Sequence, residues 1–308
     1  DRSPSRGLGD VYKRQVKDAP WIGHGLGSFE AHYMDYQANF FKQCGQSRFS
    51  MLADNVKQPF NEYLGLLLNF GIIGLLVLLL LMVIIIYCYR KNPSVEKQIA
   101  FYSLSSIGIF SFFSYPFAYP FVWVVTFLSI FIITSEYIKP LFSNILIKKI
   151  ACMFILTYSL FGSSKLFERI QAELDWGKAS TLALCKSYNE TLPTYERLEK
   201  MFVSNPYFLY NYAAVLQEMK QYTESLEVAL KCRQYWADYD LELIIGENYQ
   251  QLNKPELAEK YYNSASMMCP SRFLPLYKLF HLYKTNGEKE RSLAMAEAVI
   301  SKPMKIKT

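Results

Sequence analysis

Two long stretches without a charged side chain constrain this sequence more than any other feature. Residues 63–89 carry no charge, and residues 98–135 again contain no Asp, Glu, Lys or Arg. A helix needs about 20 apolar residues to cross a bilayer, so the first stretch predicts one crossing and the second is long enough for two. A buried helix of a soluble protein is the alternative for residues 63–89, but an uncharged run of this length favours a membrane span.

The second stretch is interrupted near its middle by Ser114-Tyr-Pro-Phe-Ala-Tyr-Pro120. Its prolines remove backbone donors and stop helices, and its tyrosines have the amphipathic character favoured at a membrane interface. A last apolar segment, residues 145–162, is shorter and has Lys148 and Lys149 near its start. Residues 63–163 are therefore expected to form four transmembrane helices, at about 63–89, 99–116, 120–138 and 145–162.

The basic residues predict the orientation of these helices. Arg90, Lys91 and Lys97 lie in one short connection, and Lys139, Lys148 and Lys149 lie two crossings later. Basic connections stay in the cytoplasm, so residues 16–62 and everything after the fourth helix are expected on the opposite side. In a bacterial inner membrane, that side is the periplasm.

Residues 166–305 have the opposite character, because they hold most of the Glu and Lys and repeat with a period of about 34 residues. Aligning Leu216, Tyr249 and Tyr283 also aligns Ser225, Ala258 and Ser292, and then Cys232, Ala265 and Val299. This is the period of tetratricopeptide repeats, which are helix pairs that stack into a solenoid. An ordinary helical bundle is the alternative. The predicted fold is all-α, with polytopic transmembrane helices followed by a tetratricopeptide-like α-solenoid.

The second repeat has small and aromatic residues where such a solenoid requires them. The positions are Gly246, Tyr249, Ala258, Tyr262, Ala265 and Pro270. Small residues let paired helices approach, and the tyrosines are expected to fill the core between neighbouring pairs. A turn is predicted at Asn253-Lys-Pro255. Arrays of this kind usually present a surface for a peptide, a partner protein or a polymer.

Charge and cysteine usage exclude several classes of site. The formal net charge of +6 does not indicate nucleic acid, because Lys and Arg lie at the ends of apolar runs or among acids along helices. The six cysteines form no Cys-x-x-Cys pair and no ligand spacing with the three histidines, so no metal site is expected. Cys88 and Cys152 lie in apolar runs, where they are expected to act as small hydrophobes.

The first fifteen residues are polar and aperiodic, and the string SRGLGDVYKRQ resembles an adapter-derived artefact at the end of a translated contig. Residues 1–15 are therefore expected to stand outside the fold. We also expect the natural polypeptide to begin further upstream, with additional helices before residue 16.

Five segments around the first span occur in a specific order. They are Ala19-Pro-Trp-Ile-Gly-His-Gly-Leu-Gly-Ser-Phe29, Tyr36-Gln-Ala38, Asp54-Asn-Val56, Pro59-Phe-Asn-Glu-Tyr-Leu64 and Asn69-Phe-Gly-Ile-Ile-Gly74. In this order they resemble the O-antigen ligase and polymerase family, in which a periplasmic loop of this pattern precedes one of the last transmembrane helices. The repeats and the tail Lys302-Pro-Met-Lys-Ile-Lys307 resemble Bacteroidales members of that family. The resemblance covers nearly everything after residue 16.

The resemblance implies a glycosyltransferase that takes a glycan from undecaprenyl diphosphate and passes it to lipid A core. A polymerase, which passes the glycan to another repeat unit, is an alternative within the family, as is transfer to a protein. A noncatalytic membrane-anchored repeat scaffold is the alternative outside it. The reaction energy lies in the glycosyl diphosphate bond, so no metal, nucleotide or other cofactor is expected. Without its upstream helices, this chain is expected to be inactive.

The reaction needs a base for the acceptor hydroxyl and cations for the departing diphosphate. In many relatives a histidine directly before the Asn of the Asn-Glu-Tyr-Leu motif is the proposed base, but this sequence has Phe60 there. Glu62 is the nearest replacement, because apolar surroundings can raise the pKa of a carboxylate into a useful range. An ordinary helix N-terminal residue, favoured by the macrodipole, is the alternative for Glu62.

The candidate catalytic residues are Glu62, Arg48 and His24, and the candidate substrate-binding residues are Lys57, Asn61 and Gln58. Arg48 and Lys57 can bind a diphosphate, although each can equally be a solvated or headgroup-facing residue. Asn61 can orient a substrate or cap the helix that follows. His24 lies between two glycines, where it is either near the substrate or merely exposed.

Gly23, Gly25 and Gly27 alternate with larger residues, but no strand precedes them, so they do not match a dinucleotide-binding motif. We expect them to be turn glycines. In the related proteins this segment shapes the loop and does no chemistry itself.

Overall fold

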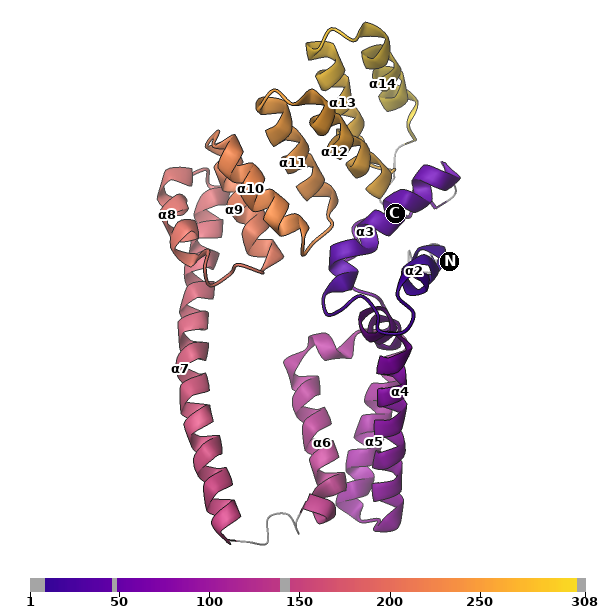
Figure 1. The fold of residues 1–308 in the computed structure, drawn as a ribbon, viewed down its shortest axis with the longest axis vertical. Helices are drawn as coiled ribbons and strands as arrows, with labels where there is room; N and C mark the ends of the chain where they lie inside the picture. Colours follow the sequence, from indigo (N-terminus) through magenta and orange to yellow (C-terminus); the bar gives the residue numbers. More distant parts are fainter. Residues whose placement is uncertain (1–8, 46–48, 139–144, 304–308) are drawn as a thin grey trace. The chain divides into compact units, whose positions relative to one another are not determined.

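The computed structural model describes residues 9–45, 49–138 and 145–303. Every regular element in these residues is helical, which confirms the expected all-α fold (Figure 1). The described residues form two compact units. The first, here called the span unit, comprises Ala19–Leu26 and Gln58–Gln171; the second, the array unit, comprises the described parts of Asp1–Asp18, Gly27–Lys57 and Ala172–Thr308.

The span unit contains the apolar helices. They are α4 (Glu62–Lys91), α5 (Val95–Phe110), the short 3-10 helix η1 (Pro116–Ala118), α6 (Pro120–Ile138) and the first part of α7 (Ile145–Leu184). Of the helices described, three are long and apolar enough to cross a membrane: Glu62–Lys91, Pro120–Tyr137 and Lys148–Leu184. Large apolar side chains are exposed along much of their length, as lipid-facing side chains would be.

The second expected span, at 99–116, is a shorter helix in the structure. α5 ends at Phe110, because the backbone tightens into turns directly after it. At the opposite end, Ser94 caps α5 and Lys97 is buried in an ion pair with Glu136, with Nζ and Oε1 3.2 Å apart. The charge of Lys97 is therefore balanced inside the span unit.

The fourth expected span continues far beyond residue 162. Helix α7 runs without a break from Ile145 to Leu184, so the predicted boundary near 163–166 is absent. Nothing there stops a helix: the Ser163 hydroxyl donates to the Ser159 carbonyl, and Lys165 forms an ion pair with Glu168 one turn later. The last turns of α7 belong to the array unit.

The array unit contains a stack of helix pairs. The end of α7 precedes α8 (Tyr188–Leu198), and the next pairs are α9 (Pro206–Glu218) with α10 (Tyr222–Arg233), α11 (Tyr239–Gln251) with α12 (Pro255–Met268), and α13 (Leu274–Thr285) with α14 (Lys289–Ser301). The turn inside each pair contains a residue with positive φ, namely Lys186, Lys220, Asn253 and Gly287. These turns recur about every 34 residues, so the backbone confirms the tetratricopeptide-like period.

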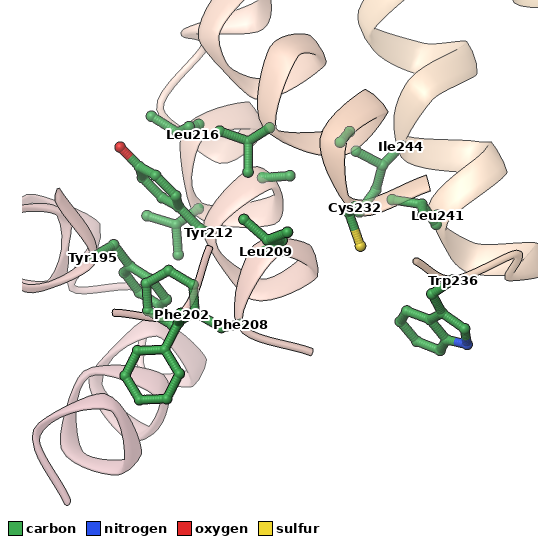
Figure 2. Close-up of a cluster of buried hydrophobic side chains, with 14 of the residues drawn as sticks. Tyr195, Phe202, Phe208, Leu209, Tyr212, Leu216, Cys232, Trp236, Leu241 and Ile244 are labelled. Carbon is green, nitrogen blue, oxygen red and sulfur yellow. The ribbon is translucent and has the colours of Figure 1, made fainter. Parts of the chain in front are cut away.

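Aromatic and aliphatic side chains together form a core cluster of the array (Figure 2). Tyr195 of α8 stacks on Tyr212 of α9 with ring centroids 5.5 Å apart. Gly246 shows why small residues recur, because a Cβ atom there would lie 2.6 Å from a ring carbon of Tyr262. Tyr262 is fully buried and fills the space that Gly246 leaves, so it packs inside the pair α11 and α12, whereas the sequence predicted a place between neighbouring pairs.

Two helices of the array unit come from the start of the chain, α2 (Gly9–Asp18) and α3 (Ser28–Cys44). Tyr12 of α2 is buried against Phe29 and Tyr33 of α3, with ring centroids 5.9 and 5.1 Å away. Residues 9–15 lie in α2 and share this aromatic cluster with α3, and their adapter-like origin stays a prediction. Residues 1–8 lie outside the described residues.

Candidate functional site

Helix α4 is broken at Gly71, which has φ 63° and ψ −161°. The segment Ala19–Leu26 bonds to the backbone groups that the break leaves open. His24 N–H donates to the Leu68 carbonyl at 2.9 Å, and Gly25 N–H donates to the Asn69 carbonyl at 2.9 Å. In the opposite direction, the N–H groups of the next two helix residues donate to the carbonyls of Pro20 and Trp21, at 2.8 and 3.1 Å.

This pairing depends on two glycines. A Cβ atom at Gly23 would lie 2.4 Å from the backbone of Asn69, and one at Gly71 would lie 2.4 Å from the backbone of Trp21. Both glycines also have positive φ, which other residues adopt only at a cost. Gly25 and Gly27 have positive φ as well, as expected of turn glycines.

Asn61 and Glu62 tie the start of α4 to the connection between α5 and α6. The Asn61 side chain accepts a hydrogen bond from Leu64 N–H at 2.9 Å and donates to the Phe112 carbonyl at 3.0 Å. Glu62 N–H donates to the Ser111 carbonyl, and its Oε1 atom accepts from Phe117 N–H at 3.0 Å. The predicted cap at Asn61 is therefore present, and Glu62 binds the backbone of the segment Ser114–Pro120.

Phe60 and the candidate residues Gln58 and His24 also lie in the span unit. The Phe60 ring meets the Tyr115 ring edge-on, with centroids 5.7 Å apart. Gln58 is exposed, and His24 is partly exposed. The segments 19–25, 58–64 and 111–119, together with the break at Gly71, therefore meet around the first turns of α4.

Of the two candidate cations, the structure describes Lys57. Lys57 belongs to the array unit, where its Nζ atom lies over the rings of Tyr207 at 4.8 Å and Trp236 at 5.3 Å. Arg48 lies outside the described residues. Within the part of the chain that the structure describes, no group of three or more His, Cys, Asp or Glu side chains is placed to hold a metal ion.

A second candidate site lies in the array unit, along an edge that we call the array edge. It is formed by Tyr207, Arg233, Ala237, Asp238, Tyr239, Glu242, Met268, Cys269 and Arg272, which lie in or beside the ends of α10 and α12 and the starts of α9 and α11. Helix α3 and the residues that follow it bind there. Ala237 N–H donates to the Glu30 carbonyl at 2.9 Å, and the buried Gln37 amide donates to the Met268 carbonyl at 2.6 Å.

Charged groups complete this contact. The guanidinium of Arg233 pairs with Asp35 of α3 and with Glu242 of α11. Glu242 is almost fully buried, and burial raises the pKa of its carboxyl, while the charge of Arg233 opposes that rise. Arg233 thus neutralises both the buried Glu242 of the array and the partly exposed Asp35 of α3.

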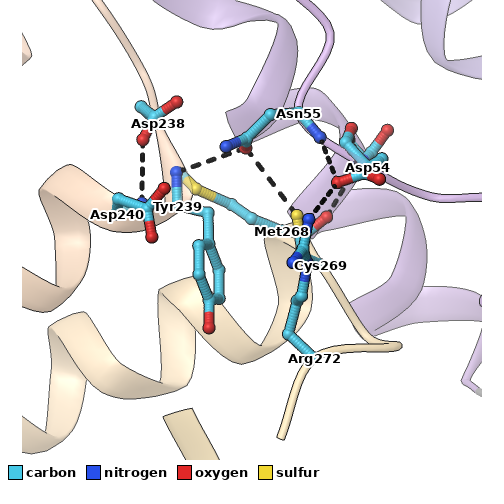
Figure 3. A network of polar contacts seen from close by, with 9 residues as sticks. Asp54, Asn55, Asp238, Tyr239, Asp240, Met268, Cys269 and Arg272 are labelled. Atoms are coloured by element: carbon cyan, nitrogen blue, oxygen red, sulfur yellow. Dashed lines mark hydrogen bonds and ion pairs between the residues drawn. The ribbon is translucent and has the colours of Figure 1, made fainter. Parts of the chain in front are cut away.

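Figure 3 shows the remaining contacts, which come from Asp54 and Asn55. Asp54 forms an ion pair with Arg272 at 2.9 Å. The Asn55 side-chain oxygen lies 3.4 Å from Tyr239 N, at the start of α11, and 3.7 Å from the Cys269 sulfur. Beside them, Asp238 is buried and caps α11, and burial raises the pKa of its carboxyl to about 6.

Sequence reasoning missed the residues of the array edge. Asp54 and Asn55 stand in one of the quoted segments, but their partners lie nearly 200 residues away or more. A helix with both Asp35 and Gln37 reads as an ordinary solvated helix unless the partner is known. Only the unusual burial of polar residues would have indicated the contact, and burial is not visible in a single sequence.

Comparison with known proteins finds distant structural likenesses. No known family matches the chain, and no curated protein matches it. Among solved structures, residues 41 to the end of MamA from Desulfovibrio magneticus RS-1 are 18% identical, with a TM-score of 0.41 over 42% of this chain and 73% of that one. YrrB, described as a TPR protein with an unusual peptide-binding site, is 18% identical, with a TM-score of 0.40 over 45% of this chain and 73% of its own.

Proposed function

We propose that the chain is the C-terminal part of a membrane glycosyltransferase of the O-antigen ligase type. It would transfer a glycan from undecaprenyl diphosphate to lipid A core on the periplasmic side of the inner membrane. One observation supports this most: parts of three of the five segments that carry the family resemblance, 19–25, 59–64 and 69–74, meet at one end of α4. Segments that are short and separate in sequence thus form one structural feature.

In this proposal Glu62 acts as the general base. The acceptor hydroxyl oxygen would attack the anomeric carbon while the bond from that carbon to the diphosphate oxygen breaks, and the diphosphate would leave with the bonding electrons. Oε1 of Glu62 accepts from Phe117 N–H, so Oε2 is the oxygen that would take the hydroxyl proton. His24, Asn61 and Gln58, which lie in the same unit as Glu62, would contact the sugar or acceptor.

The packing of the array unit supports four membrane crossings. Residues 27–57 and the repeats belong to one compact unit, so they lie on the same side of any membrane that the chain spans. The chain between them must then cross an even number of times. With α4, α6 and α7 as crossings, α5 must be one too, together with the residues that follow Phe110. The basic connection at residues 90–97 would then face the cytoplasm and the array the periplasm.

A noncatalytic, membrane-anchored scaffold is the second candidate, and specific contacts favour it. Asn61 and Glu62 already hold the connection between α5 and α6, and Lys57 already lies over two aromatic rings. Phe60 replaces the expected base and packs on Tyr115. In this alternative the same residues are structural, and the repeats act by binding a partner protein.

Deleting the gene and replacing it with variants of the full-length protein separates these possibilities. The ligase proposal predicts that polymer accumulates on undecaprenol in the deletion strain, whereas a polymerase would leave single-unit glycans. Glu62→Gln should keep the bond to Phe117 but lower transfer by about a hundredfold or more. Glu227→Gln, an exposed acid of α10, is the control. Unchanged lipopolysaccharide and capsule after deletion would favour the scaffold.

A further inference from the structure

Polar and charged groups make specific contacts between the array edge and residues 27–45 and 49–57. The hydrophobic core of the array is built from residues of α7 to α12 and the turns between them, and no side chain of Gly27–Lys57 belongs to that cluster in the described residues. The large apolar side chains at the start of α3, Phe29 and Tyr33, pack on Tyr12 of α2. This cluster therefore forms without the segment, which lies against the array edge.

The segment supplies partners to backbone groups at helix ends. Helices leave N–H groups open at their starts and carbonyls open at their ends, and other groups must satisfy them. Asn55 lies at the N–H of Tyr239 at the start of α11, and Gln37 donates to the carbonyl of Met268 at the end of α12. The backbone carbonyl of Glu30 accepts a hydrogen bond from Ala237 N–H, which lies in the turn between α10 and α11.

Charge pairing adds direction to this contact. The cations of the edge, Arg233 and Arg272, pair with acids of the segment, Asp35 and Asp54. Lys57, a cation of the segment, lies over the aromatic rings of Tyr207 and Trp236 at the edge. The edge thus has a charge and hydrogen-bond pattern that fits one helix followed by an Asp-Asn pair.

We propose that the array edge is an intramolecular docking site, and that its occupant is the chain's own residues 27–45 and 49–57. The segment is continuous at both ends with parts of the candidate site at α4, through Leu26 and Gln58. Docking holds both ends of this segment, Gly27 and Lys57, on the array unit. The repeats thus serve, at this edge, to hold the loop and not an external ligand.

Variants on the segment alone test this, because they leave the core of the array unchanged. The double variant Asp35→Arg and Asp54→Arg places cations against Arg233 and Arg272. In the full chain, in detergent or nanodiscs, hydrogen exchange of residues 28–44 should rise about tenfold or more, while exchange within α9 and α10 stays within about twofold. Asn39→Arg, an exposed position of α3, is the matched control and should change neither.

A charge exchange supplies the second measurement. Adding Arg272→Asp to Asp54→Arg recreates the ion pair in reverse and should restore at least part of the protection lost in Asp54→Arg alone. Unchanged exchange of residues 28–44 in the double variant would overturn the proposal. So would a joint rise in exchange across α9 and α10, because the segment would then be part of the array core. These hydrogen-exchange measurements need no transferase activity. A result that overturns the docking proposal would therefore leave the proposed function untouched.

Discussion

The backbone of Trp21 passes so close to Gly71 that a Cβ atom there would lie 2.4 Å from the Trp21 carbonyl carbon. This contact joins a loop segment to a break in an apolar helix fifty residues later in the chain. The backbone groups freed by the break have partners in that segment, which matters because unpaired backbone groups are costly in apolar surroundings. Specific backbone hydrogen bonds therefore stabilise the break at Gly71.

Replacing Gly71 with alanine is expected to undock the segment Ala19–Leu26. The new methyl group overlaps the Trp21 backbone, and the positive φ is strained for alanine, so the span unit should lose about 2 kcal/mol or more of stability. Thermal unfolding in detergent, followed by proteolysis within residues 19–26, measures this. Gly162→Ala is the control, because no atom lies within 4 Å of its Cβ position. Equal behaviour of the two variants would show that the close approach is not required.

Gly246→Ala tests the packing of the second repeat. Its methyl group would meet the Tyr262 ring at 2.6 Å, which predicts a loss of about 1–3 kcal/mol for the array. Denaturant unfolding followed by tryptophan fluorescence reports on the array through Trp176 and Trp236. Adding Tyr262→Leu should recover part of the loss, whereas Gly177→Ala, with open space at its Cβ position, should be neutral. A neutral Gly246→Ala would contradict the account of the small residues.

Sequence patterns predict the helices of the array well and its contacts poorly. The period of about 34 residues and the need for a small residue at Gly246 follow from local composition, because helix pairing fixes which positions must be small. The length of α7 does not, since Lys165 ends an apolar run without ending a helix. The break at Gly71 depends on a distant partner, Trp21, and a glycine alone does not reveal that partner.

The pH dependence of stability should carry the signature of Asp238. Burial raises the pKa of its carboxyl from an ordinary 3.8 to about 6, so the folded chain binds this proton more tightly than the unfolded chain does. The stabilising effect of that proton is complete below pH 3.8 and is lost as the pH rises through about 6. Ionised Asp238 at pH 8 then costs up to about 3 kcal/mol relative to the protonated form.

Asp238→Asn keeps the oxygen that caps α11 and removes the charge. We expect the variant to be more stable than the parent chain at pH 8 and equal to it near pH 4. Denaturant melts of both proteins at the two pH values measure the difference, and Glu227→Gln controls for the loss of an exposed acid. A variant that is less stable at pH 8 would mean that the Asp238 charge is favourable where it lies.

Membrane topology is the central requirement. The array edge can hold residues 27–57 only if the array and these residues lie on the same side of the bilayer. Single-cysteine labelling in intact cells tests this directly, with probe sites at Asn39 in α3, at Glu227 in α10 and at Ser94 in the connection between α4 and α5, each in a cysteine-free background. We predict that a membrane-impermeant reagent that reaches the periplasm labels the first two and not the third. Labelling of Asn39 and Glu227 from opposite sides would contradict the account.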